Sequence, residues 1–361
     1  MAEDKSPPQI TSDYRPFYKQ WQEIEGIDVI EANFIEDLRK VELKPWKRKG
    51  GDGAFINYSG PGDNDAYLCE IPPGGSLHPQ KHMFEETLFV LEGKGSTIVW
   101  IDGGTKQTFE WGPGSLFSPP LNTWHQHVNS QKDKPARYLA VTLAPLIMNT
   151  YHNKDFVFNC PFQFKDRYHG QEDYFSGKGR LCKSANLTIL VWDSNFIFNV
   201  LDLDLIEWKE RGEGKSLYFE LADNSLSAHI AEFPVGTYKK AHSHGHGAHI
   251  IVLTGKGYTL FWEEGQRIRR VDWKAGSFII PPEEVVHQHF NTGDTPAKYI
   301  ALHSRSSQKH RSGRKKWRDD LPVARGGTQI EYEDEDPMIR ETFEKELQKA
   351  GIECHMPKTA K

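Results

Sequence analysis

The chain has 361 residues, with 45 Lys and Arg against 50 Asp and Glu, a formal net charge of −5 at pH 7 and 37% hydrophobic residues. This length accommodates two domains with extensions, and the 12% aromatic content is ample for packed cores. A mildly acidic chain gives no electrostatic reason to expect a nucleic-acid or membrane partner, and no run of 18 apolar residues is present to span a bilayer. Four scattered cysteines without a CxxC pair, and a charged N-terminus without an apolar signal core, predict a cytoplasmic protein with reduced thiols.

Strands dominate the expected elements. We expect an N-terminal arm (1–32) with a short amphipathic helix from Tyr14 to Ile27. A first β domain (33–145), an aromatic-rich linker (146–194) and a second β domain (195–304) follow. The chain then continues as an extension (305–361) with a basic loop and a helix from Pro337 to Ala350. The β domains are predicted from short apolar or β-branched runs closed by glycine turns. The linker is too aromatic for a flexible tether and is expected to pack on the β domains. The basic run from Arg305 to Arg318 is expected to be a solvated loop, with a lid over an anionic substrate or an arm on a neighbouring subunit as alternatives.

The two β domains are copies of one another. A match at a constant offset of 162 residues runs without a gap from Asn33, which matches Asn195, to Asn129, which matches Asn291. Within it, Gly93-Lys94-Gly95 matches Gly255-Lys256-Gly257, and His125-Gln126-His127 matches His287-Gln288-His289. Short strands with glycine turns at this density favour antiparallel sandwiches or barrels. We therefore predict an all-β fold of two tandem barrels with short helical N- and C-terminal extensions.

Histidines concentrate in four short segments of these copies. His242 and His244 are two residues apart, so on a strand both side chains point to the same face. His287 comes from a later strand of the same copy. Three neutral imidazoles that converge inside a barrel make a transition-metal site, because nitrogen ligands suit Fe, Mn, Ni, Cu and Zn alike.

These segments resemble the two motifs of the cupin superfamily, Gly-x5-His-x-His-x3-4-Glu-x6-Gly and Gly-x5-Pro-x-Gly-x2-His-x3-Asn. In the second copy the matching residues are Gly236, His242, His244 and Gly255 for the first motif, and Gly276, Pro282, His287 and Asn291 for the second. The resemblance covers 33–145 and 195–304 and implies tandem double-stranded β-helix (jelly-roll) barrels, in which the motif histidines and glutamate bind a metal. The glycine of the second motif is absent from both copies, where Asn122 and Glu284 stand.

The second copy lacks the motif glutamate, because Ala248 stands at that position. His249 follows directly, but a regular strand would turn it outward, so it would need a β-bulge to face the interior. His246 is in phase with His244. The sequence leaves open whether the metal is held by three histidines alone or by a fourth from His246 or His249. A three-histidine site resembles the cupin dioxygenases of the gentisate and diketone-cleaving types, whose open positions accept O2 and a chelating substrate.

The first copy departs in the opposite way. It keeps the glutamate, Glu86, together with His82 and His125, but Gln80 stands at the first histidine position. This group could hold a metal with one weaker ligand, or it could survive as a polar pocket.

The residues and the resemblance together predict a metal-dependent enzyme. The leading hypothesis is a non-haem Fe(II) dioxygenase for a small chelating aromatic hydroxy acid, enol or diketone, with Mn, Ni, Zn or Cu as alternative metals. His289 and His249 are the expected catalytic side chains, in substrate contact or proton transfer. The rival hypotheses are a non-redox lyase, isomerase or hydrolase using Mn, Ni or Zn, and a non-catalytic small-molecule binder. The expected partners are a small-molecule substrate and, by the resemblance, a second copy in a homodimer or higher homo-oligomer.

Overall fold

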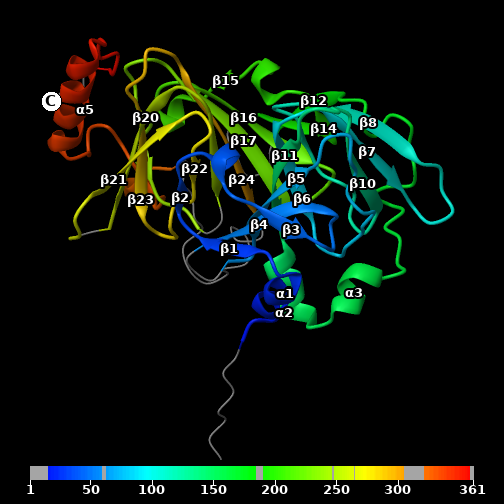
Figure 1. The fold of residues 1–361 in the computed structure, drawn as a ribbon. Coiled ribbons are helices and arrows are strands. Elements are labelled where there is room, and N and C mark those ends of the chain that lie inside the picture. The colour runs from blue at the N-terminus through cyan, green and yellow to red at the C-terminus, as the bar shows by residue number, and fades with distance from the viewer. Residues whose placement is uncertain are drawn as a thin grey trace, which may run out of the picture.

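In the computed structural model, two β-barrels lie side by side and α-helices are confined to their edges (Figure 1). The structure describes residues 15–58, 62–183, 190–245, 248–263, 265–304 and 321–357. Within these ranges the barrels themselves contain only short 3-10 turns between strands, at Leu38–Lys40, Val200–Asp202 and Lys209–Arg211. The predicted all-β fold with two tandem barrels is therefore confirmed.

The first barrel combines a large and a small sheet. The large sheet has the order β1-β4-β5-β11-β6-β9-β14 with β3 beside β4, and the small sheet the order β10-β7-β8. Burial alternates along β7 and β10, as expected for strands with one face on the core. The strands are β1 (Asp28–Glu31), β3 (Lys44–Trp46), β4 (Gly51–Asn57), β5 (Asp65–Ile71), β6 (Glu86–Glu92), β7 (Gly95–Trp100), β8 (Gln107–Trp111), β9 (Leu116–Phe117), β10 (Trp124–Asn129), β11 (Ala136–Thr142) and β14 (Phe196–Ile197).

The second barrel repeats this plan. Its large sheet has the order β12-β13-β16-β17-β24-β19-β22-β2 with β15 beside β16, and its small sheet the order β21-β20-β23-β18-β25. The strands are β2 (Phe34–Ile35), β12 (Gly179–Lys183), β13 (Leu190–Ser194), β15 (Ile206–Glu207), β16 (Lys215–Leu221), β17 (Leu226–Phe233), β18 (Ala241–His242), β19 (His249–Thr254), β20 (Lys256–Trp262), β21 (Arg269–Lys274), β22 (Phe278–Ile279), β23 (Val286–Asn291), β24 (Ala297–Ser304) and β25 (Gln329–Ile330).

Each copy lends one strand to the other barrel. β2 belongs to the first copy in sequence but pairs with β22 of the second barrel, and β14 of the second copy pairs with β9 of the first. Equivalent hydrogen bonds hold both exchanged strands. Ser115 Oγ donates to the carbonyl of Phe198, and Ser277 Oγ, its match in the repeat, donates to the carbonyl of Glu36. The predicted domain boundaries at 33 and 195 therefore fall just before strands that serve the opposite barrel.

The repeat also extends further toward the N-terminus than the sequence match. β1 runs parallel to β4, and β13, at the same offset of 162, runs parallel to β16. The linker between the copies packs on the first barrel through α2 (Ala144–Tyr151) and α3 (Lys154–Asn159), where Met148 and Val157 are fully buried. Phe175 of the linker stacks on Phe109 with ring centroids 4.1 Å apart.

The C-terminal helix forms over the predicted residues. α5 (Pro337–Ala350) begins at the Asp336 cap, whose carboxylate accepts from the backbone N–H of Met338, and ends at Gly351. Its buried residues recur every four positions at Ile339, Phe343 and Leu347, and they pack in one cluster with side chains of β20 and β23. The N-terminal helix is shorter than predicted, since α1 spans Phe17–Glu25.

The basic run from Arg305 to Arg318 lies outside the described residues. Over the part of the chain that is described, no helix combines the length and apolar character needed to cross a bilayer. The four cysteines are free thiols, as predicted.

Candidate metal centres

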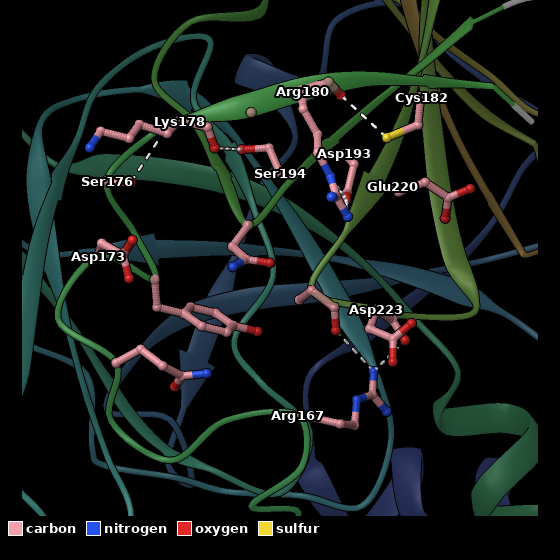
Figure 2. A pocket seen from close by; sticks show the side chains of 15 residues that line it. Arg167, Asp173, Ser176, Lys178, Arg180, Cys182, Asp193, Ser194, Glu220 and Asp223 are labelled. Carbon is pink, nitrogen blue, oxygen red and sulfur yellow. Dashed lines mark hydrogen bonds and ion pairs between the residues drawn. The ribbon is translucent and has the colours of Figure 1, made fainter.

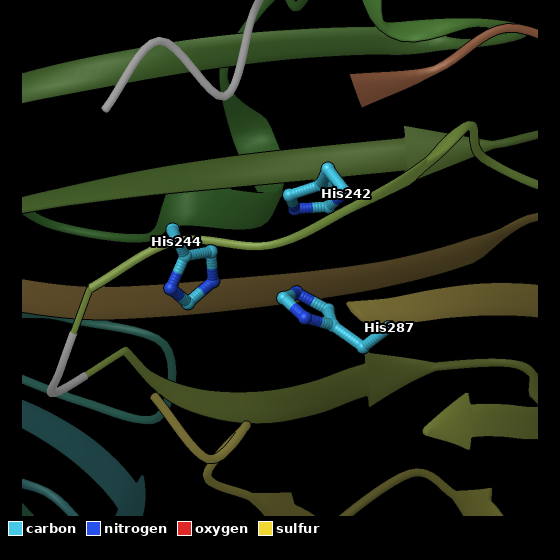
Figure 3. A group of neighbouring side chains, drawn as sticks. All are labelled: His242, His244 and His287. Atoms are coloured by element: carbon cyan, nitrogen blue, oxygen red, sulfur yellow. The ribbon is translucent and has the colours of Figure 1, made fainter. Parts of the chain in front are cut away.

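The three histidines of the predicted triad meet inside the second barrel (Figure 3). His242 ends β18 and lies directly opposite His287 of β23, while His244 follows in the next segment of chain. The ring centroid of His287 is 4.3 Å from that of His242 and 4.7 Å from that of His244. One ring nitrogen from each residue lies within 4.8 Å of the others, a spacing that one metal ion could bridge.

Backbone carbonyls orient all three rings. The Nδ1 atoms of His242, His244 and His287 lie 3.2, 2.8 and 3.2 Å from carbonyl oxygens, which can only accept. Nδ1 therefore carries the proton in each ring and Nε2 presents a lone pair. Burial, reinforced by the neighbouring Arg211 and His287, lowers the pKa of His242 well below its usual range, and burial with His244 does the same to the pKa of His287. Converging lone pairs on three rings, of which His242 and His287 are buried, suit a metal ion.

The first barrel holds a second group of a different composition. His82, Glu86 and His125 are all buried, and a carboxylate oxygen of Glu86 lies 3.4 Å from Nε2 of His82 and 3.3 Å from Nε2 of His125. The Nδ1 atoms of both histidines again face backbone carbonyls. Nε2 of His82 and Oε1 of Glu86 are buried without a hydrogen-bond partner among the described residues. This donor set also fits a metal ion.

A chain of hydrogen bonds holds Glu86 from behind. Tyr67 Oη donates to Oε2 of Glu86 over 2.6 Å, and Lys49 Nζ donates to Tyr67 Oη over 2.6 Å. Burial alone would raise the pKa of Glu86, but the neighbouring His82 and Lys49 lower it well below its usual range. Glu86 is therefore ionised, and the first barrel balances its buried cation with its own carboxylate.

The second barrel keeps a cation at the matching position but has Ala248 in place of the glutamate. Arg211 matches Lys49 at the offset of 162, and its Nη2 donates to Nε2 of His242 over 2.8 Å. Lys239 is buried beside it, and burial together with Arg211 lowers the pKa of Lys239 to about 7. In the described part of the chain, the cavity beside His242 has no acidic residue in its lining: Trp208, Arg211, Ser216, Tyr218, His229, Lys239, Lys240, His242 and Tyr299. The sequence analysis did not single out Arg211 or Lys239. Arg211 could have been found from the repeat, because it matches the basic residue Lys49 at the offset of 162.

One predicted residue, His249, takes another position. His249 is paired with Leu302 in regular register, and the β-bulge of its strand falls between Val252 and Thr254. Without a bulge at His249, its ring turns away from the triad, and its Nδ1 lies 3.4 Å from Asn64 of the first copy. The structure thus does not bring His249 to the metal group, where we expected a fourth ligand or a catalytic side chain.

Gln80 does lie beside its expected neighbours. Its Nε2 is 3.1 Å from Nε2 of His125, while its Oε1 accepts from Arg48. His246 lies outside the described residues. His289 lies next to the triad, with its ring centroid 5.5 Å from that of His287.

The two residues at the missing motif glycine keep a glycine-like backbone. Asn122 has a φ of 53° and Glu284 a φ of 64°, so both occupy the left-handed region. Asn122 also anchors the linker, since its Nδ2 donates to the carbonyls of Cys160 and Phe162. The turn that precedes each second-motif histidine is thus preserved without glycine.

A wider hollow lies between the linker and the second copy (Figure 2). Its arginines are engaged, because Arg180 pairs with Asp193 and Arg167 donates to the carbonyls of Ala222 and Asp223. Neither metal group contributes to its lining, so it is not the candidate site.

The comparisons with known proteins place the two copies in one family. The family described as the cupin domain matches residues 67–142 and again residues 229–303. A curated relative, 5-aminosalicylate 1,2-dioxygenase from Comamonas sp., is 27% identical over 121 residues, which cover 31% of this chain and 30% of that enzyme. Two solved structures of oxalate decarboxylase variants from Bacillus subtilis cover 76% of this chain and 78% of theirs, one at 13% identity and a TM-score of 0.49, the other at 15% and 0.48.

Proposed function

Because this chain belongs to the cupin family through two tandem cupin domains, we propose that it is a metal-dependent enzyme whose working centre is the second barrel. The reaction we propose is oxygenation of a small, anionic, chelating substrate by a non-haem Fe(II) dioxygenase, with aromatic hydroxy acids as the first substrate class. The observation that carries the proposal is the histidine triad beside two basic side chains, Arg211 and the buried Lys239, in a cavity whose described lining has no carboxylate.

Charge supports an anionic substrate. A divalent ion held by His242, His244 and His287 would add two positive charges next to Arg211 and the buried Lys239, and bringing like charges together in a partly buried space is costly. In the first barrel Glu86 supplies a negative charge to the metal group, whereas the second barrel has Ala248 at that position. A carboxylate or phenolate on the substrate would supply the missing negative charge.

The chain's own groups have definite tasks in this scheme. Fe(II), when bound, would supply O2 activation and Lewis acidity. Once the lone pair of His242 Nε2 is given to a metal, that nitrogen no longer accepts from Arg211 Nη2. An anionic group of the substrate would accept from Arg211 in its place, so Arg211 would bind and orient the substrate. Burial of His242 and His287 limits the access of water to the reacting atoms.

The curated relative supports the substrate class, since its printed name describes a dioxygenase of an aminosalicylate. That alignment spans less than a third of either chain, so the activity proposed here depends mainly on the triad and its charges.

Metal analysis and O2 uptake test the proposal together. Purified, chelator-free protein should contain iron or bind Fe(II), and should consume O2 with a substrate from a panel of salicylates, catechols and diketones. His242→Ala should lose metal from the second barrel and all O2 uptake. A second barrel without metal affinity would refute the proposal, and tight ligand binding that survives His242→Ala would point to a non-catalytic binder.

A non-redox reaction in the first barrel is the second candidate. The specific observation behind it is the ionised Glu86, placed between two histidines and hydrogen-bonded to Tyr67, because a carboxylate can serve as general acid or base. Turnover without O2, abolished by Glu86→Gln but retained in His242→Ala, would establish a lyase, isomerase or hydrolase there with Mn, Ni or Zn.

We further propose a cytoplasmic homodimer that acts on small molecules without a nucleic-acid or membrane partner. The strands β2 and β14 are exchanged within one chain, so a dimer would need another surface. Light scattering should then give twice the chain mass of 41.4 kDa.

A further inference from the structure

Beside each metal group, one further imidazole is held by a matching pair of threonine and tryptophan side chains. In the second barrel, Nδ1 of His289 lies 2.8 Å from Oγ1 of Thr259, and the indole N–H of Trp273 donates to that same oxygen over 3.0 Å. In the first barrel the matching residues are His127, Thr97 and Trp111, with distances of 2.8 and 2.9 Å. All three pairs of residues are related by the offset of 162. The device is thus present twice and lies outside both metal groups.

The chemistry of the three groups sets the direction of these bonds. An indole N–H can only donate, so Thr259 must accept from Trp273. Thr259 is fully buried, and in the described part of the chain the other polar atom within hydrogen-bond distance of its hydroxyl is Nδ1 of His289. The hydroxyl hydrogen therefore goes to Nδ1, and the proton of the neutral ring sits on Nε2. Thr97 gives the same result for His127.

Both rings face the barrel interior beside a metal group. His289 follows His287 by two residues on β23, so the two side chains share a face. His127 stands in the same relation to His125, with ring centroids 5.5 Å apart. Nε2 of His127 is buried and has no hydrogen-bond partner among the described residues. An unpaired buried N–H costs about 1–3 kcal/mol, which favours a ligand that brings an acceptor atom.

We propose that in each barrel the Trp–Thr pair fixes this further imidazole as a neutral hydrogen-bond donor, whose Nε2–H binds an oxygen of the ligand held beside the metal group. His289 and His127 are then neither metal ligands nor general bases, and Thr259 and Trp273 are positioning residues. Because Nδ1 of each ring accepts the threonine hydroxyl hydrogen, it carries no proton of its own, and the ring is neutral in this arrangement. The contact between His289 and a substrate rests on the proposed function of the second barrel. The position of the proton on Nε2 does not depend on that function.

Nitrogen NMR of the metal-free, full-length protein tests the tautomer. Long-range 1H–15N correlations of histidine-labelled protein should show the Nε2–H form for two rings, whose signals disappear in His289→Gln and His127→Gln, respectively. Thr259→Val, which removes the hydroxyl at nearly constant volume, should lose the Nε2–H pattern of His289 and leave His127 unchanged. Thr97→Val should do the reverse, and Thr259→Ser should keep the wild-type pattern.

An Nδ1–H tautomer in the wild type, or an unchanged His289 pattern in a folded Thr259→Val protein, would overturn the inference. The ligand contact is tested with Zn2+-loaded protein and salicylate as the probe: the Nε2–H signal of His289 should shift on binding in the wild type and not in Thr259→Val. Salicylate that binds without shifting this signal would overturn the contact. Failure of O2 uptake with the expected tautomer intact would instead count against the proposed function alone.

Discussion

Replacing Arg211 by Met should weaken the binding of an anionic substrate while leaving the metal in place. The guanidinium of Arg211 lies 2.8 Å from His242 Nε2 and lines a cavity with no acidic residue in its described lining. A hydrogen bond to a charged group contributes about 1.5–3 kcal/mol. At about 1.4 kcal/mol per factor of ten, the loss corresponds to a roughly ten- to hundredfold rise in Kd for the substrate. Met retains much of the apolar length of Arg, so packing against Trp208 should change little.

The assay is a titration of the iron-loaded protein with the best substrate of the panel, without O2, alongside metal analysis of each variant. Arg211→Lys reproduces the residue of the first barrel and should keep part of the affinity, because it keeps the charge but not the planar set of donors. Lys49→Met removes the corresponding cation of the first barrel and should leave this Kd unchanged. An unaltered Kd in Arg211→Met, with normal iron content, would refute the assignment of Arg211 to the substrate.

Three further changes test other parts of the structure. The pKa of His289 is lowered to about 3, so the folded chain binds fewer protons than the unfolded one below pH 6.5, and its stability should fall as the pH drops from about 6.5 toward 3. In urea melts, His289→Gln should reduce that slope by up to about 1.4 kcal/mol per pH unit, and an unchanged slope would contradict the neutral buried ring. Gln80→His, which completes a four-ligand set with Glu86, should raise the metal affinity of the first barrel in equilibrium dialysis, and Glu86→Gln in the same background should cancel the gain. Phe343→Ala should destabilise the chain by about 3–5 kcal/mol, because this side chain of α5 is fully buried, and a loss below 1 kcal/mol would mean that the helix does not cover the barrel.

Much of the candidate site follows from the sequence because local patterns govern it. The offset of 162 aligns the two copies, and the two-residue period of a strand places His242 with His244 and His287 with His289. The same period turned His249 away from the triad unless a bulge intervened, and the structure has its bulge three residues later. Glu86 and its replacement by Ala248 were likewise visible, since a register match compares positions one by one.

Other features depended on contacts between residues far apart in the sequence. The exchange of β2 and β14 between barrels, the pairing of β25 with the strand that carries His242, and the approach of Arg211 to His242 have no local signature. A strand's sequence states which face is apolar, but not which edge it will join. Only the assembled barrel decides which polar groups share one buried space, and therefore which charges must be balanced there.

The sequence by itself thus determined that two equivalent barrels form and which side chains face their interiors, because a repeat and an alternation are properties of the chain. The tertiary structure decided the character of each interior. It gave the first barrel a carboxylate held by Tyr67 and Lys49, and it set the histidine triad of the second beside Arg211 and Lys239. Charge balance in a buried space depends on every strand that closes around it, which is why the proposal of an anionic substrate needed the three-dimensional fold.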